Sequence, residues 1–250
     1  MTASSEVAPE ELVTDASALI RTATDAGVAM RLLGGLAFYV LAPSSRGGPL
    51  MRRYRDFDVA VPAKSGPAAT RILEASGLTP DKHFNALHGA RRMIFESSKG
   101  YPVDVLIGTF QMCHRLEIED GFDRHELVIA PSDLLLTKLQ IAAIEPKDLA
   151  DATALLLDLP VGSGAGTIEA QRFAAPLAED WGFFHSVELN LDRVRTFAET
   201  TLERAGAAVV AERIAALASA MEAAPKSLRW RMRARVGERV AWYETPEEVG

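Results

Sequence analysis

Three aspartates in two short apolar segments are the side chains of this chain most suited to chemistry. Asp56 and Asp58 lie in residues 55–61 (RDFDVAV), and Asp104 lies in residues 102–107 (PVDVLI). Because side chains alternate between the two faces of a strand, Asp56 and Asp58 are expected on one face, roughly 6–7 Å apart. If the second segment forms a neighbouring strand, Asp104 joins them. Carboxylates crowded in this way repel one another, and bound divalent cations commonly relieve the repulsion.

The same acids have a simpler interpretation as partners of nearby arginines. Arg53, Arg55 or Arg92 could neutralise them in salt bridges that only stabilise the fold. An Asp-x-Asp pair by itself also occurs often in turns and helix caps. Its position at the start of an apolar, β-branched segment favours metal binding, and the structural interpretation stays open.

A pair of glycines, Gly34 and Gly35, separates two short apolar segments. Residues 28–33 have the composition of a strand and residues 36–41 that of a helix. The glycines are therefore expected at a strand-to-helix turn. There they would let the backbone approach a phosphate closely and would offer amide donors at the start of a helix.

The elements around these residues predict an α+β fold. The pattern predicts strands at residues 28–33, 56–61, 92–97, 103–107 and 126–130. It predicts helices at residues 11–26, 36–41, 67–76, 132–144 and 146–159, with several more between 167 and 249. We expect a mixed sheet flanked by helices, followed by a helical C-terminal part. The corresponding domains are residues 1–160, which include the helix of Lys138, and residues 167–250.

The ordered set of motifs resembles the polymerase-beta-like nucleotidyltransferase superfamily. That pattern is a Gly-Gly or Gly-Ser turn, Asp-x-Asp on the next strand and a third aspartate on a later strand. Residues 131–139 (PSDLLLTKL) and 147–151 (KDLAD) are similar to the lysine helix and the Lys/Arg-Asp-x-x-Asp helix of the AbiEii-type branch, which holds bacterial toxin and abortive-infection nucleotidyltransferases. The resemblance covers about residues 32–159. The chain departs from it in the long spacing between Gly35 and Asp56 and in the absence of a serine after Gly34.

The resemblance implies a fold of the nucleotidyltransferase type and roles for six residues. The catalytic residues, which would also hold two Mg²⁺ ions, are Asp56, Asp58 and Asp104. Contacts to the nucleotide would come from Gly34, Gly35 and Lys138. An alternative for Lys138 is a lysine that reaches solvent from a helix whose leucines face the core. For Asp148 and Asp151 we expect pairing of Lys147 with Asp151 or support of their helix.

The implied activity is transfer of a nucleoside monophosphate from an NTP to an acceptor hydroxyl. The toxin branch implies an RNA or tRNA end, or a protein hydroxyl, as the acceptor, and an antitoxin protein as a possible partner. A small-molecule acceptor, as in antibiotic nucleotidyltransferases, is the next candidate. The alternative from another class is a non-catalytic binding module with the same fold.

A basic segment near the C-terminus is the candidate RNA-binding surface. Its cations are Lys226, Arg229, Arg231, Arg233, Arg235 and Arg239, and Trp230 and Trp242 lie among or beside them. Arginines and tryptophans together suit phosphate contacts and base stacking. The alternative is a solvated helix face.

Composition limits the classes of protein that the chain can belong to. With 27 basic and 34 acidic residues the formal net charge is -7, which disfavours a broad nonspecific nucleic-acid surface. Cys113 is the only cysteine, so an internal disulfide is excluded. Residues 1–11 lack the pattern of a signal peptide, and no stretch is apolar enough to span a membrane. We therefore expect a cytoplasmic protein without a membrane partner, and we interpret its five histidines as structural or surface residues.

Overall fold

The computed structural model describes residues 7–164 and 166–245. Residues 1–6, Ala165 and residues 246–250 lie outside this range. The chain forms two compact units. We call them the sheet unit (7–40, 53–110 and 117–130) and the helical unit (41–52, 111–116 and 131–245). The helix of Lys138, which was expected in the N-terminal domain, belongs to the helical unit.

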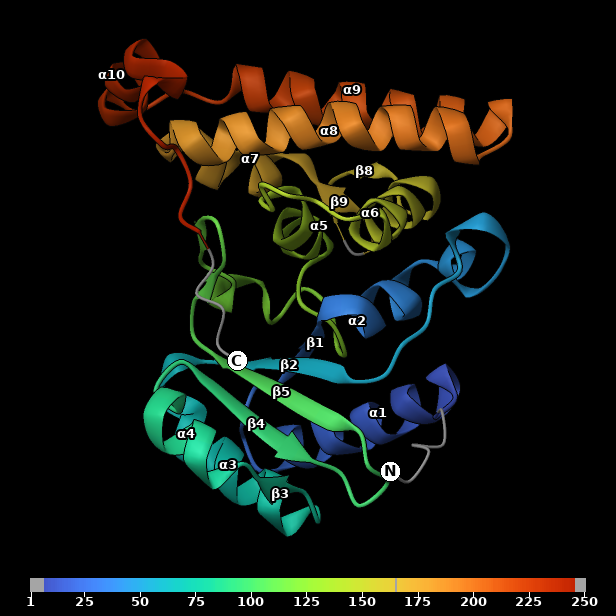
Figure 1. The fold of residues 1–250 in the computed structure, drawn as a ribbon, viewed down its shortest axis with the longest axis vertical. Coiled ribbons are helices and arrows are strands. Elements are labelled where there is room, and N and C mark those ends of the chain that lie inside the picture. The colour runs from blue at the N-terminus through green and yellow to red at the C-terminus, as the bar shows by residue number, and fades with distance from the viewer. Residues whose placement is uncertain (1–6, 165, 246–250) are drawn as a thin grey trace. The chain divides into compact units, whose positions relative to one another are not determined.

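The sheet unit is built on one five-stranded mixed sheet (Figure 1), which confirms the predicted α+β fold. Its strands are β1 (Arg31–Leu33), β2 (Phe57–Val61), β3 (Thr79–Pro80), β4 (Arg92–Glu96) and β5 (Pro102–Ile107), in the order β1-β2-β5-β4-β3. The β2–β5 pair is parallel, and the other neighbours are antiparallel. The helices are α1 (Pro9–Asp25), α2 (Gly34–Leu41), α3 (Gly66–Ala75) and α4 (Lys82–His88).

Alternating burial along the central strands separates a core face from a more open face. In β5, Val103, Val105 and Ile107 are buried, and the residues between them are only partly covered. In β2, Phe57 and Val59 are likewise buried and Asp58 between them is partly covered. The acidic side chains therefore lie on the open face, as the period-two pattern predicted.

The prediction of a strand at residues 126–130 is wrong. Only Leu32 and Val128 form a bridge there, with hydrogen bonds from the amide of Leu32 to the carbonyl of Leu127 and from the amide of Ile129 to the carbonyl of Leu32. The segment is apolar because Val128, Ile129 and Ala130 are buried. Burial of a connecting segment, rather than membership of the sheet, explains its composition.

The described residues of the helical unit form six α-helices. They are α5 (Pro131–Leu139), α6 (Pro146–Asp158), α7 (Ala170–Glu179), α8 (Trp181–Thr201), α9 (Arg204–Ala223) and α10 (Leu228–Val236). Figure 1 shows the long helices α8 and α9 side by side, and residues of the two helices are in contact. None of the described helices combines the length and the apolarity that crossing a membrane requires.

Short elements complete the chain. The two-residue strands are β6 (Phe110–Gln111), β7 (Arg115–Leu116), β8 (Val161–Gly162) and β9 (Ile168–Glu169). The 3₁₀ helices are η1 (Pro43–Arg46), η2 (Gly48–Leu50), η3 (Ala63–Ser65), η4 (Glu119–Gly121) and η5 (Gly237–Arg239).

Candidate active site

Asp58 and Asp104 lie directly opposite each other on neighbouring strands. The parallel register of β2 and β5 pairs the Cα atom of Asp58 with that of Asp104. Neighbouring strands are about 4.8 Å apart, and residues paired in register point to the same face. Both carboxylates are partly covered. The fold therefore brings together two of the three predicted acids on the open face of the sheet.

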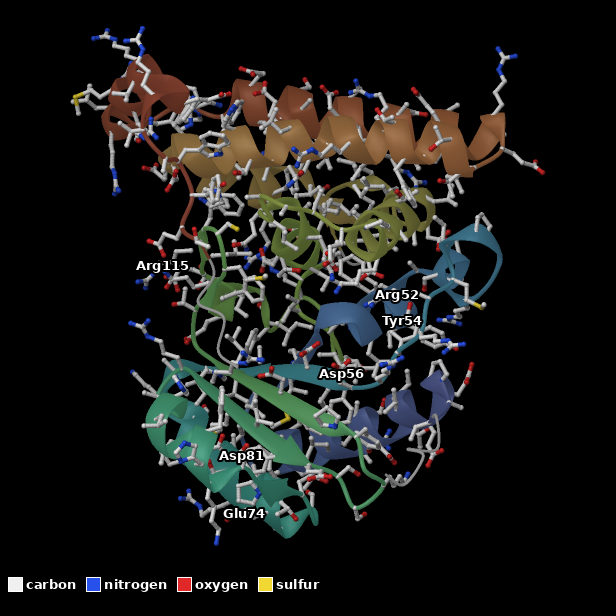
Figure 2. All side chains as sticks on the ribbon, viewed as in Figure 1. Arg52, Tyr54, Asp56, Glu74, Asp81 and Arg115 are labelled. Atoms are coloured by element: carbon white, nitrogen blue, oxygen red, sulfur yellow. The ribbon has the colours of Figure 1, made fainter. Side chains whose placement is uncertain are left out.

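Asp56 lies one residue before the first residue of β2 and is exposed. Figure 2 shows it beside that strand. Within the described part of the chain, no three acidic, histidine or cysteine side chains are grouped so that they could hold a metal ion. Nucleotide-bound Mg²⁺ commonly uses one or two carboxylates and completes its shell with phosphate oxygens and water. The Asp58–Asp104 pair has the hard oxygen donors that this mode of binding needs.

Arg92 on β4 supplies a positive charge to this face. Its Nε donates hydrogen bonds to both carboxylate oxygens of Asp104, at 3.0 Å and 2.8 Å, and its Nη2 donates a third to Oδ2. The hydrogen bond to Asp104 raises the pKa of Arg92 above its ordinary value, burial opposes the rise, and the charges of Asp104 and Asp58 add to it. Arg53, Arg55 and Arg92 were the arginines expected as partners of the acids if these only stabilise the fold. Of the three, Arg92 pairs with Asp104.

Phe84 on α4 extends the surroundings of Arg92, and the sequence pattern did not single it out. The guanidinium carbon of Arg92 lies 5.6 Å from the centroid of the Phe84 ring, within the range of a cation–π contact. In the sequence, Asp81 could have indicated the start of α4. Its side chain accepts a hydrogen bond from the amide of Phe84 and caps the helix.

Gly34 fits the predicted turn because a side chain there has no room. Its φ of +65° is left-handed, and a Cβ atom at this position would lie 1.8 Å from Oδ2 of Asp58. The carboxylate of Asp58 therefore packs against the glycine that begins α2, where a helix N-terminus favours negative charge. Gly35 is the second residue of the same helix. The strand-to-helix turn is confirmed.

Lys138 belongs to a buried charge cluster in the helical unit. Its Nζ is 2.6 Å from Oδ1 of Asp148 and 3.2 Å from Oδ2 of Asp151. Nε of Arg52 donates a hydrogen bond to Oδ1 of Asp151 at 2.8 Å. Burial raises the pKa of Asp151, and the charges of Lys138 and Arg52 oppose this rise. We call Arg52, Lys138, Asp148 and Asp151 the buried cluster.

The contacts of the buried cluster differ from what was expected for Lys138 and for Asp151. Lys138 does not reach solvent, because its side chain is only 13% exposed and its ammonium group pairs with acids from α6. Asp151 does not pair with Lys147, whose Nζ lies 2.7 Å from an oxygen of Glu145 instead. The spacing of Asp148 and Asp151 does place both acids on one face of α6, but that face turns inward.

The histidine with the largest pKa change is structural. His114 is buried, its Nε2 lies 2.8 Å from Oγ of Ser186, and its ring stacks on Phe183 with centroids 5.0 Å apart. Burial lowers the pKa of His114 to about 4, against the smaller effect of Asp180 and Glu244. His114 is therefore neutral at pH 7.

Comparison with known proteins leaves the family of this chain open. No protein-family model matches it, and no curated protein matches it at a significant level. Among solved structures it is similar to an antigenic nucleotidyltransferase-like protein from Paracoccidioides brasiliensis. The match has 14% sequence identity, covers 87% of this chain and 95% of that chain, and has a TM-score of 0.42.

Proposed function

We propose that the chain is a nucleotidyltransferase that moves a nucleoside monophosphate from an NTP to an acceptor hydroxyl. One observation carries the proposal: Asp58 and Asp104 lie in register on adjacent strands, and the carboxylate of Asp58 packs against the glycine that starts α2. Carboxylates next to a helix N-terminus with a glycine turn can position a metal-bearing triphosphate. This arrangement also agrees with the order of motifs in the superfamily that the sequence resembles.

Each group on the sheet face has a separate role in this proposal. Asp58 and Asp104 would hold Mg²⁺, and the part of exposed Asp56 in a two-ion site stays a prediction from the resemblance. The metal would neutralise phosphate charge and lower the pKa of the acceptor hydroxyl. Backbone amides of Gly34 and Gly35 would bind phosphate oxygens. The nucleotide contact of Lys138 stays a prediction, since in the described residues its ammonium group pairs with Asp148 and Asp151.

A second candidate function is a non-catalytic binding module. The observation that favours it is the pairing of Arg92 with both oxygens of Asp104, because an internal cation can neutralise the acids without any metal. In that case the face would bind neither Mg²⁺ nor a metal-bound triphosphate.

The acceptor and the partners extend the proposal further. An RNA or tRNA end is the leading acceptor, since α10 carries four arginines and no acidic residue. A protein hydroxyl or a small molecule is the next candidate. A role as a toxin, with an antitoxin protein as partner, follows only from the resemblance to the AbiEii-type branch and stays a prediction.

Thermal stabilisation by ligands and transfer of label test the proposed function. Melting curves of wild type, Asp58→Asn and Asp104→Asn would be recorded with Mg²⁺, with each NTP and with both. Asp120→Asn, which changes an exposed acid of the sheet unit, is the matched control. We expect Mg²⁺-dependent stabilisation by an NTP in wild type and the control and its loss in the two site variants.

Incubation with α-labelled NTPs, Mg²⁺ and total RNA then separates the two functions. Label on RNA that depends on Asp58 and Asp104 supports the transferase. Absence of both Mg²⁺-dependent stabilisation by an NTP and label transfer supports the binding module. Equal Mg²⁺-dependent stabilisation of wild type and Asp58→Asn would mean that the nucleotide binds away from Asp58 and would contradict the transferase.

A further inference from the structure

All three tryptophans of the chain line one cavity in the helical unit. The cavity has a volume of about 450 Å³, which is the size of a small-molecule site. Trp181 begins α8, Trp230 lies on α10, and Trp242 lies in the segment after η5. Each tryptophan is only partly covered. Three segments that are separate in the sequence therefore bring every indole of the chain to one place.

Two of the polar groups at this cavity are already engaged in holding it together. Arg233 donates hydrogen bonds to the carbonyls of Gly237, Val240 and Ala241, and its guanidinium carbon lies 4.9 Å from the centroid of the Trp181 ring. Nε1 of Trp242 donates a hydrogen bond to Oγ of Ser186 at 3.1 Å. Arg233 thus fixes the chain after α10 and is a structural residue.

Trp230 differs from the other two tryptophans. Its indole Nε1 is buried and has no hydrogen-bond partner among the described residues. A buried donor without a partner is rare in folded proteins and usually marks a place for water or a ligand. An acceptor atom on a planar ligand is the group that this donor lacks.

Charge is divided between the cavity and the helix beside it. Two acidic residues, Glu179 and Asp180, and two arginines, Arg229 and Arg233, line the cavity, so their formal charges cancel. Arg229, which lines the cavity, and Arg231 and Arg235, which lie outside its lining, are exposed and form no ion pair with the described residues. A neutral aromatic group suits the cavity, and phosphates suit the helix.

We propose that the cavity binds a base of single-stranded RNA and that Arg229, Arg231 and Arg235 bind the adjoining phosphates. Base stacking on aromatic side chains next to arginines is the common mode of single-strand binding, and it tolerates different sequences. A small shift of the ring that uncovers Nε1 of Trp230 would let this donor bond an acceptor on the base. The inference rests on the proposed function only in that such an RNA supplies the acceptor hydroxyl. The formal net charge of -7 disfavours a broad nonspecific RNA surface, so a local basic segment such as α10 is required.

Quenching of tryptophan fluorescence by a single-stranded 12-mer of adenylates, measured in a salt series, tests the inference. The phosphate variant replaces Arg229, Arg231 and Arg235 by Gln. Its control removes the same charge elsewhere on the helical unit by replacing Lys147, Arg195 and Arg204 by Gln. Because each phosphate contact contributes about 0.7 to the logarithmic salt slope, the phosphate variant should lower that slope by about 2 and the control should not.

The base contact is tested with two substitutions of Trp230. Trp230→Leu removes the stacking surface and should weaken RNA binding about ten-fold to a hundred-fold. Trp230→Phe keeps a ring but removes the donor, so an intermediate loss is expected. Circular dichroism melts check that the variants fold, and the arginine variants keep the inference testable if Trp230→Leu does not.

Two outcomes would overturn the inference. Competition by inorganic polyphosphate as strong as that by RNA would show an anion-binding helix without a base site. Equal RNA binding by the phosphate variant and its control would show a solvated helix face. Neither outcome touches the proposed function, because Mg²⁺ and NTP binding are measured separately with Asp58→Asn.

Discussion

The sheet unit and the helical unit each contain aspartates paired with cations, but the two groups differ in burial. On the sheet face, Asp104 is 23% exposed and Arg92 is 44% exposed. In the buried cluster, Asp148 is 7% exposed and Asp151 is 1% exposed. Similar residue types therefore stand in very different surroundings.

This difference decides which cation can be replaced. An exposed ion pair contributes about 0–1 kcal/mol, so another cation can take the place of the arginine at little cost. In a buried pair, removing one partner leaves a charge that water cannot reach and costs about 3–5 kcal/mol. The sheet face thus suits an exchangeable ligand, and the buried cluster suits a fixed structural contact.

The largest expected effect comes from removing the cation of the buried cluster. Lys138→Met leaves Asp148 and Asp151 with Arg52 alone and should lower the free energy of unfolding by about 3–5 kcal/mol. Urea unfolding measures this change. Lys147→Met removes an exposed lysine from the same unit and should change stability by less than about 0.5 kcal/mol. Similar losses in both variants would mean that burial does not distinguish the two lysines.

A smaller effect is expected at the glycine under Asp58. Gly34 and Gly48 have the same φ of +65°, but a Cβ atom at Gly48 would meet nothing within 4 Å. Gly48→Ala should therefore cost only the backbone strain, about 1–2 kcal/mol. Gly34→Ala should cost about 1–3 kcal/mol more, since its Cβ collides with the carboxylate of Asp58.

A double variant shows whether Asp58 causes the additional cost. In the Gly34→Ala background, Asp58→Ala removes the colliding carboxylate and should recover most of the difference between the two glycine variants. Chemical unfolding of wild type, Gly34→Ala, Asp58→Ala and the double variant gives the coupling energy between positions 34 and 58. Equal costs for the two glycine substitutions would mean that the carboxylate moves away freely.

Local patterns in the sequence predicted the elements of the candidate site well. The glycine turn, β2 and β5 depend on short apolar runs, alternation and glycine, all of which are visible within a few residues. Helix α4 was missed because its seven residues contain few apolar positions, although Asp81 carries a capping signal.

Long-range pairing could not be predicted in the same way. The choice of Arg92 over Arg53 and Arg55 as the partner of Asp104 depends on β4 lying antiparallel beside β5, which no local pattern specifies. The partners of Lys138 likewise depend on how α5 packs against α6. In both cases the charged residues were visible, and the tertiary fold decided which of them meet.

The smallest effect on stability, and the sharpest test of the comparison, is expected at Arg92. Arg92→Gln keeps a hydrogen-bonding group near Asp104 but removes the charge, so stability should change by less than about 1 kcal/mol. Arg91→Gln, which changes the exposed neighbouring arginine, is the matched control.

The effect of Arg92 on metal binding is measured separately. Binding of Mn²⁺ without any nucleotide is followed by the electron paramagnetic resonance signal of the ion. Arg92 competes with a metal for Asp104 and repels it through its positive charge, so Arg92→Gln should bind Mn²⁺ about three-fold to ten-fold more tightly than wild type. Adding Asp104→Asn to the Arg92→Gln protein should abolish the gain, since the gain requires the freed carboxylate. If Arg92→Gln binds no more Mn²⁺ than Arg91→Gln does, Arg92 does not occupy the place of a metal ion beside Asp104. The sheet face would then resemble the buried cluster, a fixed ion pair, and the binding-module function would be favoured over the transferase.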